Sequence, residues 1–315
     1  MRSRLVLYVS LAVALVAVAL AALRLTPSTG ATHVVVHGSL PPKTNSYLGV
    51  YENGAPPDFQ PIEEFAKAAG RPPNLVGYFS GWVQPFDTAF ADELHQHHVI
   101  PFVQIDPTFA SVAGIAAGAY DAYLRRYAAS VRGFGHPVVI GFGHEMNAPT
   151  YSWGYGHTPA ATFVAAWRHI VTLFRAEGAR NVTWLWTINA DRPGTGPVQN
   201  WWPGAQYVTW VGVDGYYYRP SDTFTSVFGT TMDQVRKFTN KPILLSETAV
   251  GPQAQPVVKI PELFAGIFQY HALGLVWFDK SQDNGVYHQD WRLEDSQTAL
   301  AVFSLAVSDL NLVRP

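Results

Sequence analysis

The stretch between residues 137 and 187 contains two short apolar runs separated by a longer segment with helical spacing. The runs are Pro137–Phe142 (PVVIGF) and Val182–Thr187 (VTWLWT), and both are almost wholly apolar, as expected of strands that are buried on both faces of a sheet. Four large apolar side chains recur between them at the spacing of one helix face: Phe163, Trp167, Ile170 and Phe174. This order predicts two parallel strands joined by a crossover helix.

The residues around this helical segment predict where the helix begins and ends. Thr158 is expected to cap its amino terminus, and Pro159 suits the first helical position because the first N–H has no partner within a helix. Gly178 suits the other end, since glycine adopts the left-handed conformation at little cost. The same spacing recurs in two other units, at Tyr120, Leu124, Tyr127 and Val131 and, opened by Pro261, at Leu263, Ile267 and Tyr270.

The alternation of apolar runs and helical stretches continues along the chain from residue 46. The other candidate strands are Ser46–Tyr51, Leu75–Phe79, Val99–Ile105, Tyr207–Val213, Pro242–Ser246 and Gly274–Phe278. Eight such units in about 270 residues match the size of an α/β fold of the TIM type, a (β/α)8 barrel. A doubly wound open sheet is the main alternative, but the first predicted strand is not followed by the glycine-rich phosphate turn of that fold. We therefore predict one barrel domain over residues 46–315.

The amino-terminal segment differs from the rest of the chain. Arg2 and Arg4 precede the uncharged run Leu5–Leu23, whose length of about 19 residues approaches the ~30 Å thickness of a bilayer core. We expect a signal peptide or membrane anchor over residues 1–25, with the anchor preferred, and a linker over residues 26–45. Arginines ahead of the run favour a cytoplasmic amino terminus, so the protein is expected to be extracytoplasmic, either secreted or anchored by this helix.

Composition excludes several classes of protein. The 315 residues are 48% hydrophobic and 14% charged, with 21 Lys+Arg against 23 Asp+Glu and no cysteine. This balance provides no basic surface for nucleic acid, and the lack of cysteine excludes disulfides, thiolate nucleophiles and Cys-ligated zinc. The 10 Trp, 15 Tyr and 18 Phe suit either a large aromatic core or weakly charged surfaces that bind neutral sugars.

Barrel enzymes place their active sites at the C-terminal ends of the strands, so the residues that close each predicted strand are the candidates for chemistry. They are Glu52, Asn53, Trp82, Asp106, Glu145, Asp191, Tyr216, Glu247 and Asp279. A ring of carboxylates and aromatic rings suits glycoside hydrolysis, which needs two carboxyl groups beside the scissile bond, better than phosphoryl transfer, which needs cations. Glu145 and Glu247 close strands four and seven, which face each other, and a separation of ~5–5.5 Å would define a retaining enzyme. No motif requires a metal or a cofactor.

The run HEMNAPTYSWG (residues 144–154), with glutamates ending strands four and seven, resembles glycoside hydrolase family 26, which is best known for endo-β-1,4-mannanases. The likeness extends from about residue 46 to the carboxyl terminus. It implies hydrolysis with retention by double displacement, in which Glu145 is the acid/base and Glu247 the nucleophile. It also implies that His144 binds substrate, that Tyr216 hydrogen-bonds the nucleophile and that Trp277 forms an aromatic platform beneath the sugar.

The chain departs from this family pattern at one position. Many mannanases have a tryptophan three residues after the asparagine of the motif, where this chain has Thr150, so an aromatic stacking surface is missing or displaced. Trp82 and Trp153 are further candidates for lining the cleft. The expected partner is a neutral β-linked polysaccharide, with β-1,4-mannan first. Mixed-linkage β-glucan, xylan, a cell-envelope polysaccharide and a weakly active glycan-binding barrel are the alternatives.

Several of these residues also have a purely structural explanation. The two glutamates can form part of an ion-pair network, His144 can be a core histidine, and Trp277 can fill the barrel. The strand-end residues Glu52, Asn53, Asp106, Asp191 and Asp279 either contact sugar or stabilise turns. His95, His97 and His98 precede the third strand at the bottom of the barrel, so we expect structural or surface histidines there rather than a metal site.

Overall fold

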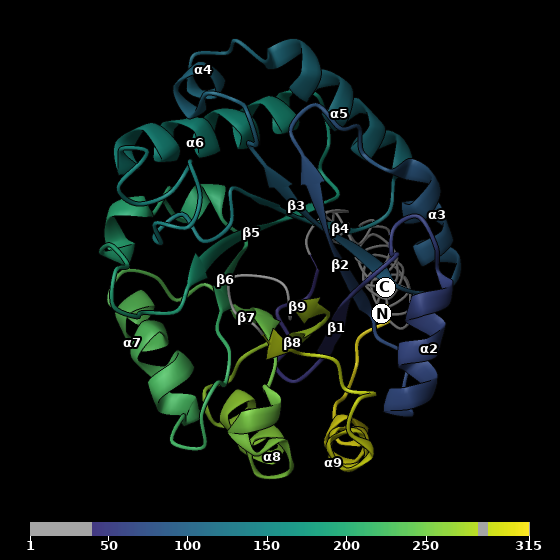
Figure 1. Cartoon of the computed structure of the whole chain (residues 1–315). Helices are drawn as coiled ribbons and strands as arrows, with labels where there is room; N and C mark the ends of the chain where they lie inside the picture. The colour runs from purple at the N-terminus through teal and green to yellow at the C-terminus, as the bar shows by residue number, and fades with distance from the viewer. Residues whose placement is uncertain (1–39, 283–288, 315) are drawn as a thin grey trace, which may run out of the picture. The chain divides into compact units, whose positions relative to one another are not determined.

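The computed structural model describes residues 40–282 and 289–314, which belong to one unit, His37–Pro315. Eight parallel strands close into a barrel in chain order, and β8 pairs with β1 (Figure 1). They are β1 (Tyr47–Glu52), β2 (Leu75–Gly81), β3 (Ile100–Asp106), β4 (Val138–Phe142), β5 (Val182–Asn189), β6 (Trp210–Asp214), β7 (Ile243–Thr248) and β8 (Gly274–Asp279). The predicted barrel is confirmed.

Helices surround this barrel on its outer side (Figure 1). They are α2 (Gln60–Ala69), α3 (Thr88–Gln96), α4 (Val112–Ala116), α5 (Asp121–Phe134), α6 (Ala160–Ala176), α7 (Thr230–Arg236), α8 (Pro256–Gln269) and α9 (Gln297–Ser308). After β8, the short strands β9 (Ser281–Gln282) and β10 (Gln289–Asp290) pair antiparallel. Within the described residues, no helix is both long and apolar enough to cross a membrane. The helix predicted over residues 1–25, and the linker up to residue 39, lie outside the described residues.

The apolar pattern of the sequence accounts for this packing. Every residue of β3 and β5 is buried, as their nearly continuous apolar runs require. The four predicted core residues of α6 are buried against the barrel, and Gly178 ends the helical region with a φ of 79°. This predicted helix face therefore forms the interface between α6 and the sheet.

Several predicted element ends are wrong. Thr158 does not cap α6, because its hydroxyl donates to the Ser152 carbonyl oxygen and the helix begins two residues later. Pro261 does not open α8, which begins at Pro256, so Pro261 leaves one backbone hydrogen bond inside the helix unmade. The sixth strand begins at Trp210 rather than at Tyr207, because Ala205–Tyr207 form a 3-10 turn.

Candidate active site

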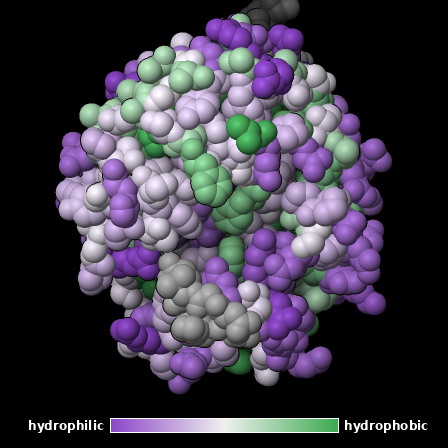
Figure 2. Space-filling view, turned by 45° about the horizontal axis from the view of Figure 1, so that its top comes forward, coloured by the Kyte–Doolittle hydropathy of each residue, from purple (hydrophilic) through white to green (hydrophobic). Residues whose placement is uncertain are grey.

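A hollow of about 210 Å³ lies at the C-terminal ends of the strands, where the barrel fold predicts it. Its polar lining residues are Asp106, His144, Glu145, Glu247 and Gln282. Its aromatic lining residues are Phe79, Tyr151, Tyr216, Tyr218, Phe278 and Trp291. Figure 2 shows the surface recessed near the middle of one face, where hydrophobic residues lie beside hydrophilic ones. The two predicted catalytic glutamates therefore line one shared hollow, which we call the central hollow.

Glu145 lies in a tight turn that follows β4. Gly143 has a φ of 55° and Glu145 a φ of 54°, so both adopt the left-handed conformation. A Cβ at position 143 would lie 2.8 Å from the Phe163 ring, so glycine is required there for steric as well as conformational reasons. A non-glycine residue with positive φ is uncommon, and such backbone strain is concentrated at functional sites. The turn directs the Glu145 side chain into the central hollow.

Asn147 fastens this turn to the neighbouring strand. Its side-chain oxygen accepts from the Asn189 backbone N–H at 2.8 Å, and its amide nitrogen donates to the Asn189 carbonyl oxygen at 2.8 Å. The Glu145 N–H donates to the Thr187 carbonyl oxygen at 3.0 Å. The asparagine of the His-Glu-Met-Asn motif therefore positions Glu145 by tying its turn to β5, and it does not itself line the central hollow.

His144 forms hydrogen bonds with both of its ring nitrogens. Nδ1 lies 2.8 Å from Asp106 Oδ1, and Nε2 lies 3.1 Å from the Tyr151 hydroxyl. Burial lowers the pKa of His144, but the Asp106, Glu247 and Glu145 carboxyls more than offset this and raise it to about 10. The ring is thus a buried imidazolium that donates from both nitrogens, and it places a positive charge beside the glutamates.

Glu247 lies near the end of β7 and is 5% exposed. Its Oε2 accepts a hydrogen bond of 2.8 Å from the Tyr216 hydroxyl, so the predicted contact between these side chains is confirmed. Burial raises the pKa of Glu247 to about 7, while His144 and the Tyr216 hydroxyl act in the opposite direction. The next tyrosine, Tyr217, is fully buried and packs on Phe228, so Tyr216 alone of these two faces the glutamate.

Burial also raises the pKa of Glu145, although His144, Arg192 and a hydrogen bond from the Asn189 side chain lower it in part. A raised pKa keeps a carboxyl protonated closer to neutral pH, which is the requirement for a general acid. The charge of Glu145 also raises the pKa of Glu247, so ionisation of Glu145 disfavours ionisation of Glu247.

A third buried carboxyl, Asp214, was missed by the sequence analysis. It ends β6 opposite Glu247 in the strand register, is fully buried, and accepts a hydrogen bond of 2.5 Å from the Ser246 hydroxyl. Burial, followed by the charges of Glu247 and Glu145, raises the pKa of Asp214 well above its usual range. In the described part of the chain, Asp214 Oδ2 and Glu247 Oε1 have no hydrogen-bond partner. Its position directly after the sixth predicted strand was the signal that could have identified it.

The prediction that Trp277 lies beneath the sugar is wrong. Its ring is 1% exposed and packs on Phe303 of α9 at 5.1 Å, and its Nε1 donates to the Trp291 carbonyl oxygen at 3.1 Å. Successive side chains of a strand point to opposite faces, so Phe278 faces the central hollow and Trp277 faces the helices. Phe278 and Trp291 therefore provide aromatic surface where Trp277 was expected.

Trp82 and Trp153 are also buried away from the hollow, contrary to the prediction. Trp82 is 5% exposed and packs on Tyr123 at 5.1 Å. Trp153 stacks on Tyr151 at 4.5 Å and donates to the His144 carbonyl oxygen at 2.9 Å. Trp153 thus supports Tyr151, the residue after Thr150, whose ring lines the hollow in place of the missing tryptophan.

The remaining polar strand-end residues divide between the site and the turns. Asp106 holds His144, whereas the Asp191 carboxylate accepts from Thr195 and Gln234 and stabilises its own turn. Glu52, Asn53 and Asp279 line a separate hollow of about 390 Å³. His95 stacks on His136 and His97 on Phe59, and the described residues contain no His, Asp or Glu group suited to a metal ion.

We expect Glu52→Gln to stabilise the protein at pH 8. Burial and the neighbouring Asp279 charge raise the pKa of Glu52 from 4.5 to about 10. Between these values the folded state keeps a proton that the unfolded state releases, so stability falls as the pH rises through this window. The variant has no titrating carboxyl at this position. Its free energy of unfolding, measured with urea, should exceed that of wild type by on the order of 1 kcal/mol at pH 8 and should equal it at pH 4. Glu63→Gln, at an exposed position of α2, is the matched control; equal curves for Glu52→Gln and wild type at pH 8 would refute the assignment.

Tyr216→Phe should lower kcat about tenfold to a hundredfold, because it removes a hydrogen bond to a charged group. The same loss raises the pKa of Glu247, so the acid limb of the kcat/KM profile should move to higher pH. A pH–rate profile on one soluble substrate measures both effects. An unshifted acid limb would show that Tyr216 does not control the ionisation of Glu247.

A parallel barrel with a pair of buried glutamates, a tyrosine on one of them and aromatic walls defines a glycoside hydrolase of the barrel type. The chain belongs to glycosyl hydrolase family 26, whose family model matches residues 118–308. The resemblance predicted from the His-Glu-Met-Asn motif is thereby confirmed.

Several known proteins resemble this chain in sequence or in fold. The chain is 28% identical to Endoglucanase H of Acetivibrio thermocellus over 81% of its own length and 29% of that protein. It is 29% identical to mannan endo-1,4-beta-mannosidase A and B of Caldalkalibacillus mannanilyticus over 40% of its length and 22% of that protein. The chain thus spans less than a third of these two relatives. The catalytic domain of an endo-beta-1,4-mannanase from Bacillus sp. JAMB-750 shares the fold, with a TM-score of 0.64, 16% identity and coverage of 85% of this chain and 87% of that domain.

Proposed function

We propose that the protein hydrolyses a β-linked polysaccharide with retention of configuration. The observation that carries this proposal is that Glu145 and Glu247 line one hollow, with Glu247 held by the Tyr216 hydroxyl. Glu247 attacks the anomeric carbon while Glu145 gives its proton to the departing glycosidic oxygen, which breaks the C–O bond and forms a glycosyl ester on Glu247. Glu145 then takes a proton from water, whose oxygen attacks the same carbon and releases Glu247.

The surroundings of the two glutamates suit these different roles. Burial raises the pKa of Glu145, which favours its protonated form in the free enzyme, whereas the hydrogen bond from the Tyr216 hydroxyl lowers the pKa of Glu247 and favours its ionised form. Formation of the ester removes the charge of Glu247 while the positive charge of His144 remains. The pKa of Glu145 is then expected to fall, which makes it the base of the second step.

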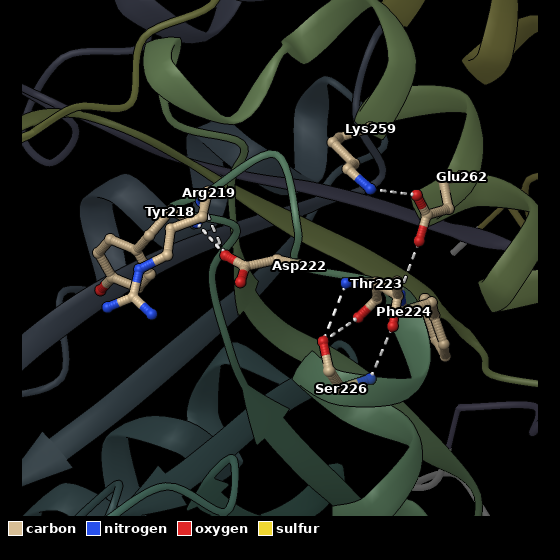
Figure 3. Close-up of polar contacts among 8 residues, drawn as sticks. All are labelled: Tyr218, Arg219, Asp222, Thr223, Phe224, Ser226, Lys259 and Glu262. Carbon is tan, nitrogen blue, oxygen red and sulfur yellow. Dashed lines mark hydrogen bonds and ion pairs between the residues drawn. The ribbon is translucent and has the colours of Figure 1, made fainter.

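The leaving part of the substrate binds in a second hollow of about 380 Å³, which we call the leaving-group hollow. It shares Glu145, Tyr216 and Tyr218 with the central hollow. The acid must contact the leaving oxygen, so the sugar beyond Glu145 lies on this side. Figure 3 shows how the loop after β6 that forms one wall is held: Asp222 accepts from the backbone N–H groups of Tyr218 and Arg219. A preorganised wall of this kind favours binding without a cost for ordering the loop.

Figure 3 also shows a second set of bonds that fixes the same loop further along. Glu262 of α8 accepts from the Phe224 N–H at 2.9 Å and from Lys259 at 2.7 Å. Lys259 is 6% exposed, so its ammonium group is buried, whereas the Glu262 side chain is 31% exposed. The loop is therefore anchored both to itself and to α8.

For the substrate, we propose β-1,4-mannan first, on the family resemblance. A second candidate, mixed-linkage β-glucan, is favoured by the relative named Endoglucanase H, which matches 81% of this chain, and by the absence of the tryptophan at Thr150. Reducing-end release from mannan, mixed-linkage β-glucan, xylan and a cell-envelope polysaccharide separates these candidates. Product formation on one of them supports hydrolysis, whereas binding without release of reducing ends would identify a glycan-binding barrel and overturn the proposal.

We further propose that the catalytic barrel acts outside the cytoplasm, on the strength of Arg2, Arg4 and the apolar run Leu5–Leu23. Expression of the full chain in a bacterial host tests this. The barrel is expected in the membrane fraction with its body accessible to protease from outside, or in the medium after cleavage. Recovery of full-length chain in the cytosol alone would refute it.

A further inference from the structure

Tyr155 is an exposed aromatic residue that lies outside both hollows described above. Its side chain is 43% exposed and lines a third hollow of about 350 Å³, together with His157, Asn200 and Trp201. Phe109 and Phe268 are more exposed, at 107% and 70%, but neither lines a hollow described here. Of these three exposed rings, only that of Tyr155 also lines one of the hollows described above.

The Tyr155 ring rests on the backbone of Gly196. A Cβ added at Gly196 would lie 2.3 Å from Cδ2, 2.6 Å from Cε2 and 2.8 Å from Cγ of that ring. Contacts this close to three ring atoms mean that the glycine Cα lies against the ring and that any larger residue would displace it. The ring is thus supported from beneath and keeps substantial exposed surface.

The Tyr155 ring and the Gly196 backbone beneath it form a platform. Both residues are hydrogen-bonded to the segment that carries Glu145. The Tyr155 N–H donates to the Ala148 carbonyl oxygen at 3.0 Å, and the Gly196 N–H donates to the Asn147 carbonyl oxygen at 2.7 Å. Asn147 in turn positions Glu145, as described above. The loop at residues 191–201 also contributes Asp191, Arg192 and Pro193 to the leaving-group hollow and Pro197, Asn200 and Trp201 to the third hollow. The platform is therefore continuous in structure with the leaving-group side of the active site.

The chemistry of the third hollow suits an uncharged sugar chain. None of the described residues that line it is Asp, Glu, Lys or Arg, in contrast to the leaving-group hollow and to the hollow around Glu52. A flat ring offers its face to the apolar C–H surface of a sugar, and Asn200 and His157 offer polar groups at its margin. An exposed ring flanked by a few polar groups is the arrangement expected of a site for a neutral glycan.

We propose that Tyr155 is the platform of a distal binding site for the leaving-group end of a long, neutral β-linked polysaccharide. The site would hold a stretch of polymer beyond the sugars that occupy the leaving-group hollow. This proposal rests on the proposed hydrolysis only for the identity of its ligand. It predicts that long polysaccharides bind more tightly than short oligosaccharides.

The test compares polymer affinity among variants in a Glu247→Ala background, where no polymer is cleaved. Native gels that contain galactomannan, mixed-linkage β-glucan or xylan report the affinity as retardation. Tyr155→Ala should weaken binding of the retarding polymer about five- to tenfold, the usual effect of losing one aromatic stack. Gly196→Ala should weaken it similarly by displacing the ring, whereas Tyr155→Trp should retain binding and Phe268→Ala, an exposed ring on α8, should change nothing.

A second measurement separates a distal site from a general defect. In the otherwise wild-type enzyme, Tyr155→Ala should raise KM for the polymer about fivefold or more. It should change kcat/KM for an aryl β-disaccharide, which is too short to extend past the leaving-group hollow, less than twofold. Unaltered polymer affinity of Tyr155→Ala, an equal loss in Phe268→Ala, an equal loss on both substrates, or no retardation by any of the polymers would overturn the proposal. Failure of the proposed hydrolysis would instead appear as a wild-type enzyme that is retarded by a polymer but releases no reducing ends from any of them.

Discussion

Glu247→Ala is expected to lower kcat on polysaccharide about 10⁴-fold or more while leaving substrate binding intact. The change removes the group that forms the covalent bond, and no other described carboxylate has the same environment, since Asp214, opposite it on β6, is fully buried and accepts a hydrogen bond from Ser246. Initial rates of reducing-end release measure the loss. Glu63→Ala, which removes an exposed carboxylate on α2, is the matched control and should retain full activity.

Azide distinguishes loss of the nucleophile from general damage to the site. In Glu247→Ala, azide can occupy the vacated space and attack an activated aryl β-glycoside directly, because that substrate needs no acid. The product is then an α-glycosyl azide, of inverted configuration, and the hydrolysis product of wild type does not return. Near-normal polysaccharide hydrolysis by the variant, or a β-configured azide product, would show that another residue forms the covalent bond.

Glu145→Ala is expected to have effects that depend on the leaving group. On polysaccharide, whose leaving alcohol must be protonated, the rate should fall about 10²- to 10⁴-fold. On a dinitrophenyl β-glycoside, whose leaving group departs as an anion, formation of the glycosyl-enzyme should be nearly unaffected. The second step still lacks its base, so the ester on Glu247 should accumulate and kcat should be low, with a burst of dinitrophenol equal to the enzyme present.

Added azide should restore turnover of this variant on the activated substrate, because azide needs no base to attack the ester. The product is then a β-glycosyl azide, since two inversions preserve the configuration. Equal losses on polysaccharide and on the dinitrophenyl glycoside, without a burst, would mean that Glu145 positions substrate and does not transfer the proton.

Much of the barrel could be predicted because its strands are short, apolar and buried on both faces. Val182–Thr187 and Pro137–Phe142 were recognisable for this reason, and their observed ends differ by one or two residues. The start of the sixth strand was not recognisable, because the turn at Ala205–Tyr207 depends on tertiary contacts such as that of the Tyr207 carbonyl with Trp167. Local sequence does not encode such a contact.

The polar centre of the site could be predicted better than its aromatic walls. Glu145, Glu247 and Tyr216 follow apolar strands, and every strand end points to the same face of the barrel. The choice between Trp277 and Phe278 depends on which face of β8 is turned inward, and a strand that is apolar on both faces carries no such signal. Trp82 and Trp153 lie in loops, and their burial depends on partners such as Tyr123 and Tyr151.

Covalent trapping tests the central claim most directly. A 2-deoxy-2-fluoro β-glycoside with an activated leaving group slows both steps but allows the first to proceed, so the glycosyl-enzyme accumulates. Mass spectrometry of the intact chain followed by peptide mapping should find one fluoroglycosyl group, attached to Glu247. A label on any other residue, or turnover of the reagent to an inverted sugar without a label, would contradict the proposed mechanism.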